Sequence, residues 1–326
     1  MVELLRFSEI LKITNPLWVF FNLPIYGYTV NNSLMNKLLI IIFALSISTV
    51  ANADVKGKVL NDLSGKISST IGNLIPGDGV TEASVEIREK DNPDFEILGV
   101  RDILSKENSN LFTQFSIHNN EVNGDNRYIG NLGLGYRFLN SDKSMMFGVN
   151  SFYDRDIQEK HSRVSLGFEA KASVLDFTFN QYQKTTNQKI IDGTKEQVLS
   201  GNEYNLSSQV PYMPWTTFNF QGYRWENEKA VNDTKGNVYS LEMALNPSLQ
   251  FDISRDVSSV NGVDDVDVAK LTFVYPPREN KPTLQDGLVS EIAFVKENME
   301  GKLKEKVRRN NNLVVEIQGS VIITSK

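Results

Sequence analysis

The chain contains no cysteine and only two histidines among its 326 residues. The absence of cysteine excludes a disulfide framework and thiolate metal sites. Zinc motifs, phosphate-binding loops and dinucleotide fingerprints are also missing. The net charge is −6, so the chain lacks the basic excess of nucleic-acid-binding proteins. We therefore expect no enzyme, no metal or cofactor site and no nucleic-acid partner, and we interpret the isolated His118 and His161 as structural.

A hydrophobic run long enough for a spanning helix, about 20 residues, is missing as well. The most apolar run, Leu38–Ile47, is shorter; Lys37 precedes it and Ala51-Asn52-Ala53 follows it. A basic start, an apolar centre and a small-x-small end are typical of a secretory signal peptide. We predict a signal peptide at residues 35–53, cleaved between Ala53 and Asp54.

A signal peptide stands at the beginning of the translated chain. We therefore expect translation to begin at Met35, with residues 1–34 as a mis-assigned upstream extension. The alternative is one unusually long signal sequence that begins at Met1.

The segment 54–80 carries apolar residues at spacings of three and four, which predict a short amphipathic helix. These residues are Val59, Leu63, Ile67, Ile71 and Leu74. We expect a periplasmic helical segment that packs on a barrel rim. Peptidoglycan or a second copy of the chain are alternative partners for it.

From residue 81 to residue 276 the apolar period is two. In the run 131–138, Leu132, Leu134 and Tyr136 alternate with Asn131 and Arg137. Side chains of a strand alternate faces, so strand after strand has one apolar and one polar face. A soluble β-sandwich needs a dry inner face, which these strands lack. The pattern predicts an all-β fold, an antiparallel transmembrane β-barrel of about twelve strands with lipid outside and a wet lumen.

The connections alternate in length, as they do in outer-membrane barrels. The short ones are Asn140–Lys143, Ala170–Lys171 and Pro247–Ser248, and the long ones are Asn119–Asn126, Lys184–Asn202, Asn227–Asn237 and Asp256–Asp267. The apolar phase shifts from Phe218 and Phe220 to Tyr223 and Trp225, which predicts a β-bulge near Gly222. We expect Trp215, Trp225, Tyr136, Tyr153, Tyr223 and Tyr275 in interfacial aromatic girdles.

The opposite faces of these strands carry charges of both signs. The residues expected to face the lumen are Glu86, Arg88, Arg137, Asp154, Arg163, Glu169, Asp176, Glu242, Asp252 and Lys270. A mixed set does not resemble a one-sign selectivity ring. It favours a pore that is held shut or that grips a threaded segment.

After Pro276-Pro277 the pattern changes, and residues 277–326 form a separate region. Leu288, Ile292, Val295 and Met299 recur at helical spacing, which predicts a plug helix over 288–306. An extended linker follows it. Because an even number of strands returns the chain to its starting side, this region reaches the other side only through the lumen. Residues 312–326, at ~3.3 Å each, would span about 50 Å, more than the ~25 Å apolar band.

Five blocks in order carry a family resemblance: Leu111–His118, Asn131–Phe138, Gly148–Asp156, His161–Glu169 and Arg309–Glu316. Over roughly residues 81–318 the chain resembles the translocator domain of the intimin/invasin family, the inverse autotransporters. The resemblance implies a twelve-stranded outer-membrane barrel with a periplasmic N-terminus. It also implies a linker that threads the pore to export a C-terminal adhesive passenger. The linker residues that match are Arg309, Asn310, Asn311, Asn312 and Glu316.

The chain departs from the family in two places. Ala170-Lys171 stand where the family often has an aromatic cluster, and the passenger is expected to be absent or truncated. We expect a barrel in the outer membrane of a Gram-negative bacterium that anchors its own C-terminal segment and translocates it to the surface. Expected partners are lipid, the barrel-assembly machinery and periplasmic chaperones. The alternatives are a passive porin or structural barrel with a periplasmic tail, and a membrane hydrolase that uses His118.

Overall fold

The computed structural model describes residues 64–66, 68–72, 75–88, 92–260, 263–279, 281–317 and 320–322. The chain divides into two units, 1–51 and 52–326, and every described residue belongs to the second. The predictions for residues 1–34, for the signal peptide at 35–53 and for its cleavage between Ala53 and Asp54 lie outside the described residues.

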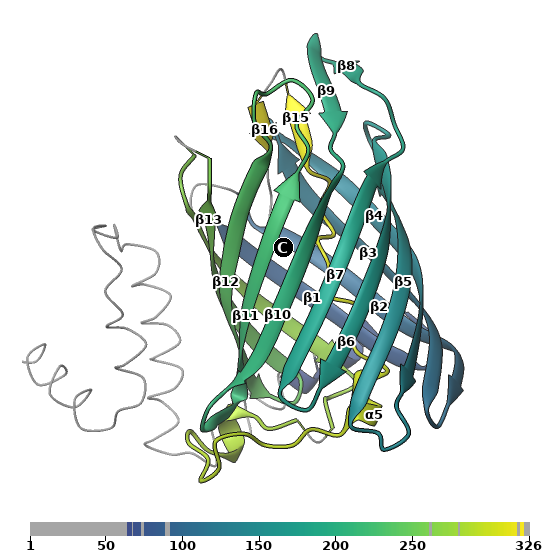
Figure 1. Ribbon diagram of the computed structural model, residues 1–326, viewed down its shortest axis with the longest axis vertical. Helices are drawn as coiled ribbons and strands as arrows, with labels where there is room; N and C mark the ends of the chain where they lie inside the picture. The colour runs from purple at the N-terminus through teal and green to yellow at the C-terminus, as the bar shows by residue number, and fades with distance from the viewer. Residues whose placement is uncertain are drawn as a thin grey trace, which may run out of the picture. The chain divides into compact units, whose positions relative to one another are not determined.

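Twelve antiparallel strands close into a barrel, which confirms the fold expected from the alternation (Figure 1). Neighbouring strands in the wall follow the order β1-β14-β13-β12-β11-β10-β7-β6-β5-β4-β3-β2. The wall strands are β1 (Gly79–Arg88), β2 (Asp94–Lys106), β3 (Ser109–Val122), β4 (Asp125–Leu139), β5 (Met145–Asp156), β6 (Ser162–Ala172), β7 (Leu175–Lys184), β10 (Gly201–Val210), β11 (Met213–Trp225), β12 (Thr234–Asn246), β13 (Leu249–Ser258) and β14 (Val266–Tyr275).

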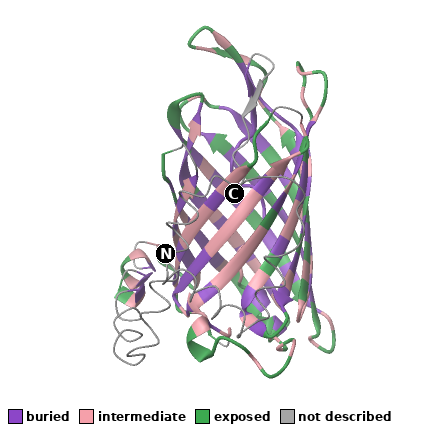
Figure 2. Ribbon diagram, turned by 90° about the vertical axis from the view of Figure 1, so that its left-hand side faces the viewer, coloured by how far each residue is buried: buried purple, intermediate pink, exposed green. Residues whose placement is uncertain are grey.

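The wall strands alternate between a buried inner face and an exposed outer face, and Figure 2 shows this alternation along the strands. On β4 and β6 the outer side chains Leu132, Leu134 and Leu166 are 59%, 57% and 68% exposed. Arg137 and Arg163 on the same strands are fully buried. Apolar side chains therefore cover the outside, and the charged face fills the inside.

The connections at the two ends of the barrel differ in length. One end, here the short-turn end, carries connections 107–108, 140–144, 173–174, 211–212 and 247–248. The other, the long-loop end, carries 89–93, 123–124, 157–161, 185–200, 226–233 and 259–265. Strand β1 begins and strand β14 ends at the short-turn end. The turn expected at Ala170–Lys171 lies at 173–174 instead.

The loop expected at 119–126 is wrong, because β3 and β4 continue through most of it. They meet in a tight turn at Asn123 and Gly124, with φ of 54° and 83°. An Asn-Gly pair adopts these positive φ values readily, as a type I′ hairpin turn requires. Asn119 and Asn120 are consequently buried members of a strand.

The β-bulge expected near Gly222 is also wrong. The pairing of β11 with β12 runs without a shift from Thr216 to Trp225. Register shifts occur instead between Gln209 and Val210 and at two other places in the wall. Without a bulge, Tyr223 and Trp225 keep the phase of the inner face, where they are 7% and 0% exposed. They do not belong to an outer aromatic girdle.

A second sheet of four strands lies at the long-loop end (Figure 1). Two of its strands, β8 (Lys189–Ile191) and β9 (Thr194–Val198), form a hairpin within connection 185–200. The other two, β15 (Val315–Ile317) and β16 (Ser320–Ile322), come from the C-terminal region. The strand order is β16-β15-β9-β8.

The C-terminal region after β14 first follows the short-turn end. A 3-10 helix, η1 (Leu284–Asp286), and a short helix, α5 (Met299–Lys302), are its regular elements there. The expected C-terminal helix is thus present but much shorter than 288–306. Residues 287–298 are not helical because their backbone bonds to the wall: Ser290 and Ala293 pair with Tyr212, and Val295 pairs with Gln209.

The described helical residues near the N-terminus, 64–66 and 68–72, fall within the helix expected at 54–80. They pack on the short-turn end, where Asn246 donates to the Ser64 hydroxyl at 3.1 Å. Among the residues that the structure describes, no helix is long and apolar enough to cross a membrane.

Candidate functional site: a lumen occupied by the C-terminal segment

Residues 303–317, here the threaded segment, run through the lumen. They enter beside α5 at the short-turn end and leave beside β9 at the long-loop end, as the course of the chain between α5 and β15 shows (Figure 1). The crossing therefore begins earlier than residue 312, the start used in the expected linker length. Leu303 to Leu313, at ~3.3 Å per residue, cover about 33 Å, enough for the apolar band.

Where the threaded segment enters the lumen, side chains of the wall bind its backbone. The Arg137 guanidinium donates to the carbonyl oxygens of Leu303, at 3.1 Å, and Glu305. Asn110 donates to the same Leu303 oxygen at 3.2 Å, and the Val307 N–H donates to Gln114 Oε1 at 2.7 Å. The segment has no strand neighbour here, so side chains of the wall satisfy backbone groups that would otherwise be left unpaired.

Charge complementarity adds to these contacts. Residues 302–309 contain five cations and one anion, Glu305. The cations pair with wall carboxylates: Lys302 with Asp176 at 3.2 Å, Lys306 with Glu82 at 2.6 Å, and Arg308 with Glu242. Glu305 pairs with the wall cation Lys171 at 3.1 Å.

A single carboxylate holds the middle of the lumen together. Asp154 on β5 is fully buried and accepts hydrogen bonds from three directions. Arg163 of the wall donates at 2.8 Å, Arg309 of the threaded segment at 2.6 Å, and Asn131 of the wall at 2.7 Å. Asp154 thus links one wall cation to one cation of the segment.

Aromatic rings lie beneath the buried arginines and add cation–π contacts, which strengthen where water is excluded. The distances from guanidinium carbon to ring centroid are 4.4 Å for Arg137 and Phe112, 4.1 Å for Arg163 and Tyr182, and 4.2 Å for Arg309 and Phe152.

Inward glycines on β4 make room for these rings. A Cβ atom on Gly135 would overlap the Phe112 ring, and one on Gly133 would overlap the Phe152 ring. The alternation Gly133-Leu-Gly135-Tyr-Arg137 therefore serves two faces. Its outer residues form part of the exposed apolar face, and its inner glycines leave room for the aromatic rings beneath the guanidinium groups.

Two of the three asparagines of the segment bond to polar wall residues. The Asn310 N–H donates to Glu203 Oε1 at 2.8 Å and its carbonyl accepts from Arg163 at 2.7 Å. The Asn311 side chain donates to Glu96 at 2.9 Å. Asn312 is fully buried, and its N–H donates to the Asn310 side chain.

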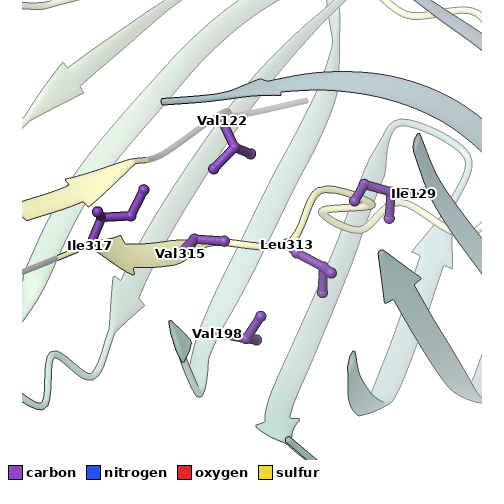
Figure 3. Close-up of a cluster of buried hydrophobic side chains, with 6 residues drawn as sticks. All are labelled: Val122, Ile129, Val198, Leu313, Val315 and Ile317. Atoms are coloured by element: carbon purple, nitrogen blue, oxygen red, sulfur yellow. The ribbon is translucent and has the colours of Figure 1, made fainter. Parts of the chain in front are cut away.

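At the long-loop end the segment becomes a strand, and its side chains alternate again. Leu313, Val315 and Ile317 pack on Val122, Ile129 and Val198 (Figure 3). On the other face, Val314 joins a cluster with Tyr182, Leu199, Tyr223, Trp225 and Val238. Glu316, the next residue on that face, is 1% exposed and bonds to loop 226–233.

The ten residues expected to face the lumen lie on the inner face of the wall, but they do different things. Arg137, Asp154, Arg163 and Glu242 contact the threaded segment, and Asp176 pairs with Lys302 in α5 just before it. Glu169 holds Arg137 at 2.8 Å, and Lys270 lies 3.6 Å from Glu96. Glu86 and Arg88 pair with each other, and Asp252 accepts from Gln250.

Sequence reasoning did not single out Phe152, Tyr182, Glu96 or Glu203 as site residues. The signal was available, since the alternation on β5 and β7 puts Phe152 and Tyr182 on the face of Asp154 and Asn180. In this lumen each of these two aromatic rings lies beneath an arginine guanidinium group.

Open space remains beside the segment, and two cavities lie among its described neighbours. One of about 530 Å³ lies at the short-turn end and is lined by residues of both signs, among them Lys171, Glu242 and Lys302. One of about 120 Å³ lies deeper, between Asp252, Lys270 and Arg309. Within the described part of the chain, no group of three or more His, Cys, Asp or Glu residues is arranged to hold a metal ion.

Comparisons with known proteins agree with this architecture. A family model described as the inverse autotransporter β-domain matches residues 46–311. An attaching and effacing protein homolog of Escherichia coli (strain K12) is 31% identical over 107 residues, which are 32% of this chain and 35% of that protein. The inverse autotransporter adhesin YeeJ of the same strain is 24% identical, over 65% of this chain and 9% of that protein. Invasin of Yersinia enterocolitica is 25% identical, over 43% of this chain and 16% of that protein.

The chain thus spans only about a third or less of the length of these relatives. A structure from a study of in-meso crystallisation of membrane proteins shares the fold, with a TM-score of 0.60 and 16% identity, over 73% of this chain and 99% of that chain. The match over residues 46–311, together with the closed twelve-stranded barrel, shows that this chain belongs to the inverse autotransporter β-domain family, a family of barrels in the outer membrane of Gram-negative bacteria.

Proposed function

We propose that this barrel anchors its own C-terminal segment and translocates it across the outer membrane to the cell surface. The observation that carries the proposal is the threaded segment, which occupies the lumen from the short-turn end to the long-loop end. In outer-membrane barrels the short turns are periplasmic and the long loops extracellular. The N-terminus is then periplasmic, and the chain leaves the pore at the surface.

The polar lumen suits the passage of an extended chain. A backbone without strand partners needs hydrogen-bond donors and acceptors along its whole path, and water or wall side chains can supply them in turn. The wall offers side-chain donors and acceptors over the crossing, such as Arg137, Gln114 and Asn131. These hydrogen bonds do not form a continuous ladder. A moving chain can therefore break and remake them one residue at a time.

The proposal assigns no catalytic residue. His118 lies 3.9 Å from Glu96 inside the lumen, where its side chain is fully buried. Its position supports a structural role and not attack on a lipid. The partners that we propose are the outer-membrane lipids, the barrel-assembly machinery and periplasmic chaperones, with peptidoglycan or a second copy for the N-terminal segment. The names of the relatives, adhesin and invasin, extend the proposal to adhesion by the exported part of the chain.

The proposal is tested by the location of an epitope tag fused after Lys326. On intact cells we expect antibody to label this tag as strongly as a tag in loop 226–233, whose Val231 is 98% exposed. A tag in turn 173–174 is the matched negative control and should be labelled only after the outer membrane is opened. If the C-terminal tag behaves like the tag in turn 173–174, the alternative holds, namely a porin or structural barrel with a periplasmic tail.

A further inference from the structure

The carboxylate of Glu316 is bound by a site built from two loops at the long-loop end. Oε1 accepts from the backbone N–H groups of Lys229, at 2.9 Å, and Ala230, at 2.8 Å. Oε2 accepts from the Glu228 N–H at 3.0 Å and from the Gln197 side chain at 2.7 Å. Glu316 is 1% exposed, so these bonds are made away from water.

The chemistry of the site matches a carboxylate closely. Two carboxylate oxygens offer about four acceptor positions, and all four are used. Consecutive backbone N–H groups in a turn form a concavity that binds anions. Because all four partners are N–H donors fixed in direction, the site requires a group that accepts a hydrogen bond at every position, as a carboxylate does. An amide in the same place would present its NH₂ group to other donors.

The loop that provides the three N–H groups is held by contacts that do not involve the threaded segment. The Asn227 side chain donates to the Asn232 carbonyl at 2.6 Å and to the Thr234 hydroxyl at 3.0 Å. Lys184 on β7 pairs with the Glu228 carboxylate. The site is therefore organised by the wall itself, which lowers the cost of ordering it on binding.

The position of Glu316 on β15 determines the register in which β15 pairs with β9. Val315 pairs with Val198 and Ile317 pairs with Glu196, while the apolar side chains of β15 face Val122 and Ile129 (Figure 3). A slip by one residue would turn Glu316 into this apolar cluster, since strand side chains alternate faces. A slip by two would put a different side chain into the carboxylate site.

We propose that the backbone of residues 228–230 and the Gln197 amide form a carboxylate-recognition site that stops the threaded segment at one register, with Glu316 as its ligand. The inference rests on the proposed translocation, because only a chain that moves through the lumen needs a stopping position. It goes further by naming the residue and the loop that determine where movement ends.

Disulfide trapping tests this inference cleanly, because the chain contains no cysteine of its own. Directly paired residues of antiparallel strands lie about 4.5–5.5 Å apart at Cα, within reach of a disulfide. The pair Val198→Cys with Val315→Cys reports the observed register. The pairs Val198→Cys with Leu313→Cys and Val198→Cys with Ile317→Cys report slips of two residues in either direction.

With Glu316 present, we expect the 198–315 crosslink to dominate. In the Glu316→Ala and Glu316→Gln backgrounds, the ratio of the 198–315 crosslink to the two slipped crosslinks should fall by roughly tenfold or more. The reason is that both substitutions remove charge-assisted hydrogen bonds to the carboxylate. Glu226→Ala, which removes an exposed carboxylate of the same loop, is the matched control and should leave the ratio unchanged. Retained heat-modifiable mobility in SDS gels verifies that each variant folds.

A ratio unchanged by Glu316→Ala and Glu316→Gln in folded barrels would overturn the stopping role of the site. All variants carry the epitope tag after Lys326, which keeps the two proposals separate. Surface labelling of the tag with an unchanged crosslink ratio contradicts only the carboxylate site. A periplasmic tag with Glu316 present contradicts translocation itself.

Discussion

At the scale of single residues, the lumen depends on where side chains are missing as much as on where they are present. Gly133 and Gly135 lack the Cβ atoms that would collide with Phe152 and Phe112. Those rings in turn lie beneath guanidinium groups, including that of Arg309 in the threaded segment. Small residues on the inner face therefore determine how the charged residues are held.

A substitution on the inner face of β4 tests this dependence. Gly135→Ala should lower the free energy of unfolding by about 1–3 kcal/mol, because the new methyl group overpacks the Phe112 ring. Gly130→Ala on the same strand is the matched control, since nothing lies within 4 Å of its Cβ position. Urea midpoints of the folded barrels in lipid vesicles measure both effects. Equal urea midpoints for the two variants would show that the Phe112 ring can move aside without loss of stability.

The central carboxylate provides a second test at this scale. Asp154→Asn leaves Arg163 and Arg309 buried with a neutral acceptor, and breaking a buried ion pair in this way typically costs about 3–5 kcal/mol. We expect the temperature at which the variant loses its folded mobility in SDS gels to fall markedly. Asp264→Asn, in an exposed loop, serves as the control. A variant as stable as this control would mean that the two arginines find other partners.

At the scale of elements, the second sheet at the long-loop end joins the hairpin of connection 185–200 to strands β15 and β16 of the C-terminal region. The hairpin β8–β9 pairs with β15 on one side, and Glu196 on β9 joins it to the wall. Arg127 donates to Glu196 at 2.9 Å, and His161 Nε2 lies 3.3 Å from it. Burial alone would raise the pKa of the Glu196 carboxyl, but the hydrogen bonds from His161 and Arg127 outweigh it and lower the pKa.

The direction of this pKa shift predicts how the hairpin responds to acid. A carboxyl whose folded pKa lies below its unfolded value of 4.5 stabilises the attachment above pH 4.5. That contribution is lost as the pH falls through the lower folded pKa. A fluorophore on Ile190→Cys should therefore gain mobility, seen as lower anisotropy, as the pH falls below 4.5. In the Glu196→Gln background this step should vanish, and an identical step there would assign it to another group.

At the scale of the whole molecule, the threaded segment makes the difference between a pore and a plugged barrel. Wall residues of β1, β4, β5, β6, β7 and β12 contact it, and it narrows the open space of the lumen to cavities such as those of about 530 Å³ and 120 Å³. Removing the segment would leave a wet lumen in which the wall carboxylates Asp154 and Glu242 lose their partner cations Arg309 and Arg308.

Two truncations measure this effect in planar bilayers. A chain that ends at Pro277 should give a single-channel conductance several times that of the full chain, because the lumen fills with water. A chain that ends at Ile317 keeps every lumen contact of the threaded segment and should conduct as little as the full chain. If the two truncated chains conduct equally, the segment does not obstruct the pore.

Much of the wall could be predicted from the sequence, because the faces of a strand follow from local backbone geometry alone. The alternation in Asn131–Phe138 indicated the strand, its lipid face and its buried Arg137 before any pairing was known. Tight turns were harder, and the Asn123-Gly124 hairpin was mistaken for part of a long loop. The apolar spacing of Leu288 and Ile292 predicted a helix that does not form there, since wall residues such as Tyr212 bond to the backbone around it.

The local pattern of residues is enough to indicate a barrel of about twelve strands with a charged interior and a basic, asparagine-rich segment after it. Three contacts follow from the folded chain alone: Asp154 joins Arg163 to Arg309, β9 pairs with β15, and loop 226–233 binds Glu316. The physical reason is the range of the interactions. Periodicity depends on neighbouring residues in the chain, whereas Asp154 and Arg309 are 155 positions apart, Gln197 and Glu316 are 119 apart, and Lys229 and Glu316 are 87 apart.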